Sequence, residues 1–311
     1  GFHGAPFLHH FSVDPASTLP KAVLLALAVP VLLISRDDFA ETPYYTLVLA
    51  SLYGACLVIS SDSFLTLFLG IELMSLPVYA LVLLAMGRPE SAEGALKYLI
   101  LGGAGTASLL LGISFTFGST GSFELAAFGA ALAAGDTMAR AAVVLVLLAF
   151  YLKAAIVPFH AWAPDAYESA SVPVTAYMAT VIKSAVLLAA VRMFAGTEVP
   201  ASMVALLAGL PLLSMVWGNL TAMKQDSFRR MIAYSSIAHA GYLFYAFLGA
   251  PAGRYEAVIF YVSAYGLMNL LAFVCLPTGE DATRDRLDNL KGLFGRSPYA
   301  AVLIAAAMLS L

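Results

Sequence analysis

Long apolar stretches, separated by short polar connections, fill most of this sequence. Most of them contain the roughly 20 residues that an α-helix needs to cross the hydrocarbon core of a membrane. They are rich in Leu and Ala and lack the alternation with a period of two that is typical of a membrane β-barrel. The pattern therefore predicts an all-α, polytopic membrane protein with about ten transmembrane helices. The stretches cover residues 21–35, 44–60, 64–86, 95–117, 139–157, 173–195, 202–219, 229–248, 255–277 and 298–311.

Composition supports a membrane protein and excludes several classes of function. The chain is 61% hydrophobic and 11% charged, whereas soluble domains carry about 25% charged residues. The net charge of −3 argues against nucleic acid as a partner. The sequence contains no glycine-rich phosphate loop, no nucleophile elbow, no cluster of metal ligands and no redox motif, so we expect no cofactor or metal in this chain.

We expect a single transmembrane helical domain over residues 1–311. The chain begins at Gly1 without a methionine and ends at Leu311 inside an apolar stretch. These features predict a sequence that is truncated at both ends.

Positive charges in the connections predict the orientation. If residues 1–20 lie on the outer side, nine Lys and Arg residues flank the inner ends of the helices and four flank the outer ends. This excess agrees with the positive-inside rule. The inner set is Arg36, Arg88, Lys224, Arg229, Arg230, Arg284, Arg286, Lys291 and Arg296; the outer set is Lys21, Arg140, Arg192 and Arg254.

Four ionisable residues lie near the middle of apolar stretches, namely Glu72, Lys153, Lys183 and His239. A charge at the centre of a bilayer costs roughly 2.5–3.5 kcal/mol on insertion scales. Such residues persist when they face a wet interior, pair with one another or take part in chemistry. The set predicts an ion path, although each residue alone also fits a structural role in packing.

The stretch around Lys153 predicts a broken helix. Pro158 and Pro164 lie six residues apart, and two prolines at this spacing cannot occupy one regular helix. Broken helices at membrane depth line wet cavities and form the ion sites of transporters. The alternative is a helix that simply ends at Pro158, which leaves the lysine inside the apolar run unexplained. We expect Asp165 and Glu168 to lie in the following loop.

The other ionisable residues are assigned from their positions. A buried lysine beside a carboxylate whose charge changes can take up or release a proton near neutral pH, which is the property of a relay. Histidine as a residue type titrates near neutrality, so His239 can extend the path from Lys183. Lys97 lies near the inner surface, where it either anchors its helix or feeds the path. His160 can connect the broken helix with the inner face.

Several long motifs resemble one family of membrane proteins. The chain is similar, from about residue 44 to its end, to subunit N of proton-pumping NADH:quinone oxidoreductase, or respiratory complex I, whose mitochondrial counterpart is subunit 2. The related L and M subunits and multisubunit cation/proton antiporters share the broken helix, but GIELMSLP and SSIAHAGY favour the N type. The similar runs are LFLGIELMSLPVYALV, ALKYLILG, FYLKAAIVPFHAWAPDAYESASVPVTAYMATVIKSA and GNLTAMKQDSFRRMIAYSSIAHAGY.

The resemblance implies roles for the ionisable residues. The family has about fourteen helices, including discontinuous ones. Glu72 and Lys153 match the glutamate and lysine whose ion pair gates the channel, and Lys183 matches the lysine at its centre. His239 matches a histidine that extends the axis. Lys97 and His160 match polar positions that feed it.

The resemblance also implies a function and partners. The chain would be a proton-translocating membrane-arm subunit of an H⁺-translocating NADH:quinone oxidoreductase, in a bacterial cytoplasmic membrane. Quinone, FMN and iron–sulfur clusters would lie in partner subunits, which comprise other membrane-arm subunits and the hydrophilic arm. Lipids would surround the chain. The alternatives are a subunit of a multisubunit cation/proton antiporter or membrane-bound hydrogenase, an M- or L-type paralogue, or a structural bundle.

Overall fold

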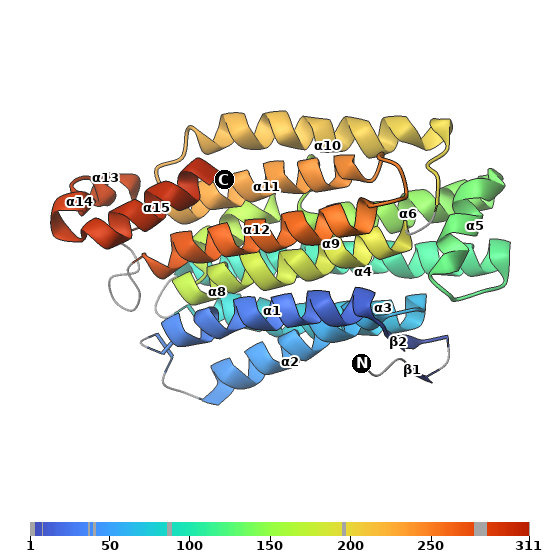
Figure 1. The fold of residues 1–311 in the computed structure, drawn as a ribbon, viewed down its shortest axis with the longest axis horizontal. Helices are drawn as coiled ribbons and strands as arrows, with labels where there is room; N and C mark the ends of the chain where they lie inside the picture. The colour runs from blue at the N-terminus through green and yellow to red at the C-terminus, as the bar shows by residue number, and fades with distance from the viewer. Residues whose placement is uncertain are drawn as a thin grey trace.

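Helices that run roughly along one axis make up almost all of the fold (Figure 1). The computed structural model describes residues 4–7, 9–36, 38–39, 42–85, 89–194, 197–276 and 285–310. The helices are α1 Pro15–Ile34, α2 Thr42–Ser60, α3 Phe64–Leu83, α4 Pro89–Thr120, α5 Ala126–Ala134, α6 Thr137–Ala154, α7 Trp162–Ser169, α8 Val172–Tyr177, η1 Met178–Ile182, α9 Lys183–Met193, α10 Ala201–Ala222, α11 Phe228–Ala246, α12 Arg254–Val274, α13 Leu287–Leu290, α14 Leu293–Arg296 and α15 Pro298–Ser310.

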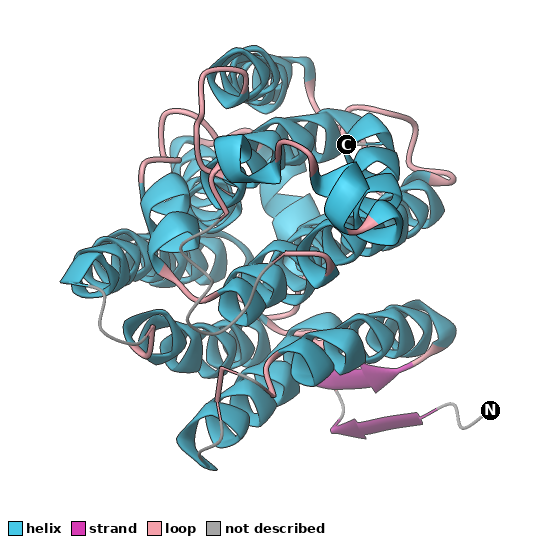
Figure 2. Cartoon of the chain, turned by 90° about the vertical axis from the view of Figure 1, so that its left-hand side faces the viewer, coloured by secondary structure: helices cyan, strands magenta, loops and turns pink. Residues whose placement is uncertain are grey.

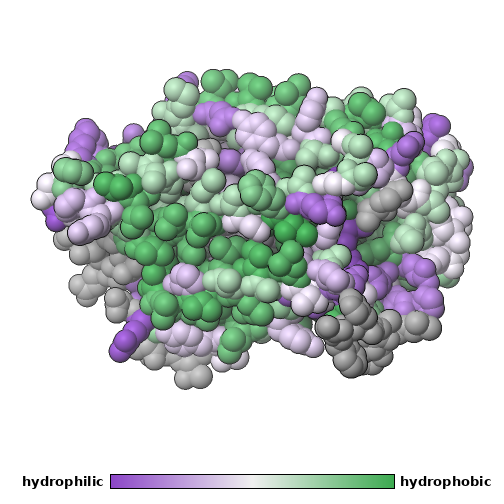
Figure 3. Space-filling view, viewed as in Figure 1, coloured by the Kyte–Doolittle hydropathy of each residue, from purple (hydrophilic) through white to green (hydrophobic). Residues whose placement is uncertain are grey.

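The predicted helical membrane fold is confirmed. Each of the ten apolar stretches contains a helix, and eight spans in the described part of the chain are long and apolar enough to cross a membrane. The remaining two stretches form α11, a less apolar helix of 19 residues, and α15, which has 13. Apolar residues cover most of the face seen in Figure 3, and hydrophilic residues gather mainly toward its two ends.

The two ends of the bundle carry different elements. At one end, α13 and α14 lie beside the start of α15 (Figure 1). At the other end, the strands β1 Gly4–Phe7 and β2 Phe11–Val13 pair antiparallel before α1 begins. Figure 2 views the bundle from the first end and places this hairpin against one side. We refer to these as the α13 end and the hairpin end.

Helix α4 is longer than the sequence pattern predicts. Its 32 residues span about 48 Å at 1.5 Å per residue, whereas the hydrocarbon core is about 30 Å thick. The predicted segment, 95–117, corresponds to its apolar part. The additional first turns carry Glu90 and Glu93 and extend to the α13 end, where they contribute to a charged pocket.

The predicted break after Lys153 is present. Helix α6 ends at Ala154, and Ala155 adopts the left-handed conformation with φ 60°. A non-helical turn of residues 155–161 follows, and α7 begins at Trp162. Pro164 lies in the first turn of α7, where a proline is tolerated because that backbone N–H has no helical acceptor.

One span is buried almost throughout and carries Lys183. Helices α8, η1 and α9 form a continuous segment, Val172–Met193, in which every residue except Arg192 is buried. The central part, Met178–Ile182, is a π-helical turn immediately before Lys183. Such turns are rare and occur frequently at functional sites, because they re-aim the side chains that follow.

Candidate functional site

Glu72 lies half-buried on α3 and is held by a neighbouring helix. Its Oε1 accepts a hydrogen bond of 2.6 Å from the hydroxyl of Thr106 on α4. The same hydroxyl also lies 3.1 Å from the Gly102 carbonyl, one turn earlier. The contact gives a carboxylate at mid-helix a polar partner, as buried charges require.

Lys153 lies in the last turn of α6 and points toward the face of α3 that carries Glu72. Its Nζ donates to Ser75 Oγ at 3.1 Å and to Tyr79 OH at 3.2 Å. Ser75 and Tyr79 follow Glu72 by three and seven residues, so the three share one helix face. A cation at this position is also favoured by the partial negative charge at the end of α6.

The implied ion pair between Glu72 and Lys153 is therefore not formed in the described structure. Glu72 is bonded to Thr106, and the ammonium group is bonded to two hydroxyl groups. In this arrangement, two hydroxyls on α3 accept hydrogen bonds from the lysine in place of a direct contact with Glu72, and the role of the pair as a gate stays a prediction. The two charges instead lie along one polar face of α3.

A glycine on α4 makes the contact between Tyr79 and Lys153 possible. A Cβ atom at Gly102 would lie 2.1 Å from the Tyr79 hydroxyl, so the close approach requires glycine. The ring of Tyr79 packs edge-on against Tyr98 at 4.6 Å, and Tyr98 stacks on Trp162 at 4.2 Å. This aromatic stack fixes the hydroxyl opposite the lysine.

Lys183 is 6% exposed and bonds to one residue of α11. Its Nζ donates to the carbonyl oxygen of Ser236 at 2.6 Å and also to the hydroxyl of the same residue. No carboxylate pairs with this ammonium group in the described part of the chain. Its recorded hydrogen-bond partners among the described residues are therefore neutral oxygens only.

Both lysines line one small cavity. Its volume of about 10 Å³ is close to the space that one water molecule needs. Its wall includes side chains of α4 and α7. Trp162 donates its Nε1–H to the carbonyl of Leu152 at 2.9 Å, which fixes the start of α7 beside the end of α6. The break in the helix thus brings Lys153 and Lys183 to a common space. The lining is Tyr98, Lys153, Ala154, Ala155, Trp162, Ala163, Tyr167, Met178, Ile182 and Lys183.

His239 continues the polar sequence from Lys183. It lies three residues after Ser236 on α11, so both side chains share one face of that helix. Its Nδ1 lies 2.7 Å from Tyr261 OH on α12, and its ring packs against Tyr265 with centroids 4.7 Å apart. Lys183 thus contacts Ser236, and His239, one turn further on the same face of α11, contacts Tyr261 on α12.

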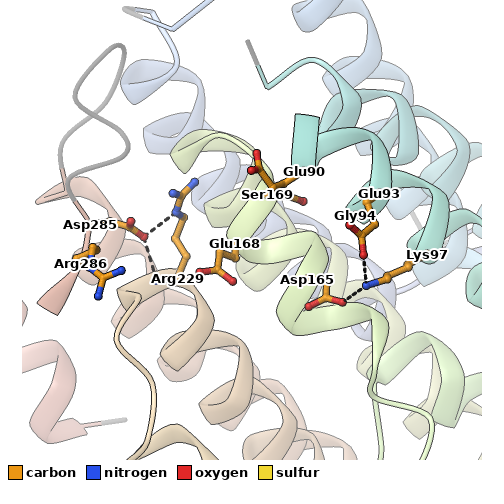
Figure 4. A pocket seen from close by; sticks show the side chains of 10 residues that line it. All are labelled: Glu90, Glu93, Gly94, Lys97, Asp165, Glu168, Ser169, Arg229, Asp285 and Arg286. Carbon is orange, nitrogen blue, oxygen red and sulfur yellow. Dashed lines mark hydrogen bonds and ion pairs between the residues drawn. The ribbon is translucent and has the colours of Figure 1, made fainter. Parts of the chain in front are cut away.

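Lys97 belongs to a charged cluster at the α13 end. Its Nζ lies 2.6 Å from both Glu93 and Asp165, and Arg230 bonds to Asp165 at 2.8 Å and to Glu168 at 2.9 Å. The cluster borders a pocket of about 460 Å³ (Figure 4). Asp165 and Glu168 were expected in a loop, but they lie on α7, because the helix restarts after the break.

Electrostatics keep this cluster charged at neutral pH. Burial alone would raise the pKa of the Asp165 carboxyl, but hydrogen bonds from Lys97 and Arg230 outweigh burial and hold it below its usual value. The carboxylate is therefore ionised on the side of the bundle where the pocket opens.

His160 lies in the turn between α6 and α7. Its ring is 6.4 Å from the rings of Trp217 and Tyr234, and its buried Nδ1 has no hydrogen-bond partner among the described residues. No hydrogen bond joins His160 or Lys97 to the four central residues in the part of the chain that the structure describes. Their role in feeding the path stays a prediction.

Four contact residues of the site did not emerge from the sequence. Ser75 and Tyr79 lie at helical spacing from Glu72, so a search along that helix face would have found them. Thr106 and Tyr261 contact the site from other helices, and no local pattern marks them.

Comparison with known proteins agrees with this geometry. A family model described as NADH:quinone oxidoreductase/Mrp antiporter, TM, matches residues 61–311. The NADH-quinone oxidoreductase subunit N of Pelobacter propionicus is 39% identical over 313 residues, which cover 100% of this chain and 67% of the relative. The chain spans about two thirds of the length of the curated relatives it matches.

Solved structures show the same fold. A chain of respiratory complex I from Thermus thermophilus superposes with a TM-score of 0.83 at 34% identity, covering 99% of this chain and 67% of its own length. A chain of the archaeal membrane-bound sulfane sulfur reductase gives 0.85 at 26% identity, covering 96% of this chain and 62% of its own. The chain therefore belongs to the NADH:quinone oxidoreductase/Mrp antiporter family of membrane proteins.

Proposed function

We propose that this chain is the proton-translocating part of a subunit in the membrane arm of a respiratory NADH:quinone oxidoreductase. The observation that carries the proposal is the cavity shared by Lys153 and Lys183 beside a break in a membrane helix. The relatives named as subunit N and the complex I structure support the same assignment.

The residues on the path perform a series of proton transfers. Glu72 sets the electrostatic field on the face of α3, and Ser75 and Tyr79 hold the Lys153 ammonium. Lys183 first passes its proton along the Ser236 hydroxyl toward His239, which leaves a neutral amine. When the field on α3 changes, Lys153 releases its proton across the cavity to this amine, with one water molecule able to bridge the gap.

The driving reaction belongs to partner subunits in this proposal. Quinone reduction, with FMN and iron–sulfur clusters, takes place there, and it reaches this chain as a movement or a change of charge at its boundary. The described residues contain no group of three or more His, Cys, Asp or Glu side chains that fits a metal ion. The Lys, Ser and His side chains of the path can each donate and accept a proton, as proton transfer requires.

The charge distribution supports an orientation with the α13 end inside the cell. Arg229 and Arg286 border the pocket at the α13 end, and Arg230 forms an ion pair with Asp165 in its wall. An inner surface carries the excess of Lys and Arg. The hairpin end, with residues 9–20, then faces outward. Protons would enter from the α13 end, where Lys97 and Asp165 lie.

A variant of the central lysine tests the proposal. In the whole complex, reconstituted into vesicles, Lys183→Met should reduce proton transport per NADH oxidised while the complex still assembles. Methionine keeps the length and the packing but cannot carry a proton. Parent-like transport in an assembled complex would exclude Lys183 from the path.

The second candidate is a cation/proton antiporter subunit without a redox partner. The description of the matching family includes Mrp antiporters, and the Mrp complex of Dietzia shares the fold with a TM-score of 0.78 at 24% identity. Purification separates the two: a redox assembly predicts co-purifying flavin and iron–sulfur subunits, whereas an antiporter predicts only membrane subunits.

A further inference from the structure

Two consecutive arginines begin α11 at the α13 end. Ser227 caps the helix, so Arg229 and Arg230 lie in its first turn. Cations are unfavourable at this position, because the N-terminus of a helix carries a partial positive charge. Their presence therefore requires partners elsewhere. Arg230 finds them on α7, and Arg229 finds them in Asp285 and in the carbonyl of Ala170.

Arg229 is buried and forms an ion pair with a residue far along the chain. Its Nε lies 2.7 Å from Asp285 Oδ2, and the two side chains are 2% and 5% exposed. A second nitrogen of the guanidinium donates to the carbonyl of Ala170, which directly follows α7. The guanidinium group of Arg229 thus joins α11, the end of α7 and Asp285.

The segment after residue 284 is attached to α11 by its backbone as well. The N–H of Phe228 donates to the Asp285 carbonyl at 3.0 Å, and the N–H of Leu287 donates to the Asp226 carbonyl at 2.8 Å. Residues 285–287 therefore move together with the start of α11. Figure 4 shows Arg229 directed toward Asp285, on the far side of the pocket from Lys97.

Helix α7 connects this point to the proton path. Its residues Trp162, Ala163 and Tyr167 form part of the wall of the cavity between Lys153 and Lys183. Arg230 holds the same helix through Asp165 and Glu168. A displacement of the α13 end would therefore move this wall.

We propose that Arg229 is a positioning residue for proton transfer, which ties the end of α7 to Asp285 so that residues 285–287 and the wall of the lysine cavity move as one unit. This inference rests on the proposed function. A purely structural role is the alternative, and it makes a different prediction. Buried ion pairs can often be replaced by well-packed apolar residues without loss of stability, so a pair with only a structural role would be dispensable for proton transport.

The test uses the whole complex with two variants. The double variant Arg229→Met/Asp285→Leu fills the site with apolar side chains. Arg229→Lys keeps the positive charge but loses the second nitrogen, which donates to the carbonyl of Ala170. We expect both to assemble and to oxidise NADH at nearly the parent rate. Proton transport per NADH should fall toward the value of the Lys183→Met complex. Parent-like transport in both variants would overturn the proposal.

Arg254 provides a matched control. It is also a buried arginine, 6% exposed, that donates to carbonyl groups of Phe194, Thr197 and Gly249, but it lies at the opposite end of the bundle. Arg254→Lys should retain the parent ratio of protons to NADH. A loss equal to that of Arg229→Lys would show that any buried arginine has this effect, and would overturn the specific role.

Hydrogen exchange separates this inference from the proposed function. Loss of the charged bond to Ala170 should raise the exchange of α7 amides about tenfold or more in the double variant. Unchanged exchange would overturn the proposal whatever the transport assay gives. If instead the proposed function is wrong, Lys183→Met will show parent-like proton transport, while the hydrogen exchange of α7 in the double variant will still rise.

Discussion

The contact between Tyr79 and Lys153 depends on a single missing methyl group at Gly102. In Gly102→Ala, the new Cβ would lie 2.1 Å from the tyrosine hydroxyl, and contacts under 3.0 Å do not occur, so the hydroxyl must move by about 1 Å or more. Its bond to Lys153 is 3.2 Å long. A shift of that size either collides with the ammonium or leaves hydrogen-bonding range.

The expected cost follows from the lost bond. A hydrogen bond to a charged group contributes about 1.5–3 kcal/mol, so the protonated form of Lys153 becomes at least about tenfold less favourable in its present position. In reconstituted vesicles, Gly102→Ala should therefore lower proton transport per NADH oxidised. Tyr79→Phe should lower it as well, since it removes the same bond without a clash.

Gly103→Ala is the matched control for this substitution. It lies on the same turn of α4, and a Cβ there meets no atom within 4 Å. Both variants gain the same helix propensity, so the difference between them isolates the contact with Tyr79. Equal transport in the two alanine variants would refute the role assigned to this tyrosine.

Two further predictions concern the hydroxyl groups of the path. Thr106→Val removes the 2.6 Å bond to Glu72 and should lower transport, whereas Thr106→Ser should retain it; equal transport by both would contradict the role of the hydroxyl. Ser236→Ala removes the hydroxyl that accepts from Lys183 but keeps the carbonyl at 2.6 Å, so transport should fall less than in Lys183→Met. A larger loss of transport in Ser236→Ala than in Lys183→Met would contradict this order.

The sequence predicted the helices and the break well, because both depend on local properties. Apolar stretches define each span through burial in lipid, and Pro158 lies in the turn that follows the helix carrying Lys153, where it prevents that helix from continuing. The restart of α7 was missed because its first turn contains a proline, and the residues after it are polar. In the structure, those polar residues form the ion pairs of Asp165, which no local pattern identifies.

The candidate site was predicted in its charged members but not in their contacts. A charge inside an apolar stretch is conspicuous, so Glu72, Lys153 and Lys183 could be named from the sequence alone. Their hydrogen-bond partners depend on which helices become neighbours. Thr106 lies 34 residues from Glu72 in the chain, and helical spacing defines a face but not the helix opposite to it.

The most direct test of the account asks whether the two lysines act in succession. Proton transport per NADH should be measured for Lys153→Met, for Lys183→Met and for the double variant in the reconstituted complex. Members of one path act as a unit, so the double variant should lose no more transport than the more damaging single variant. Losses that multiply independently, or parent-like transport in Lys183→Met, would contradict a single path through the shared cavity.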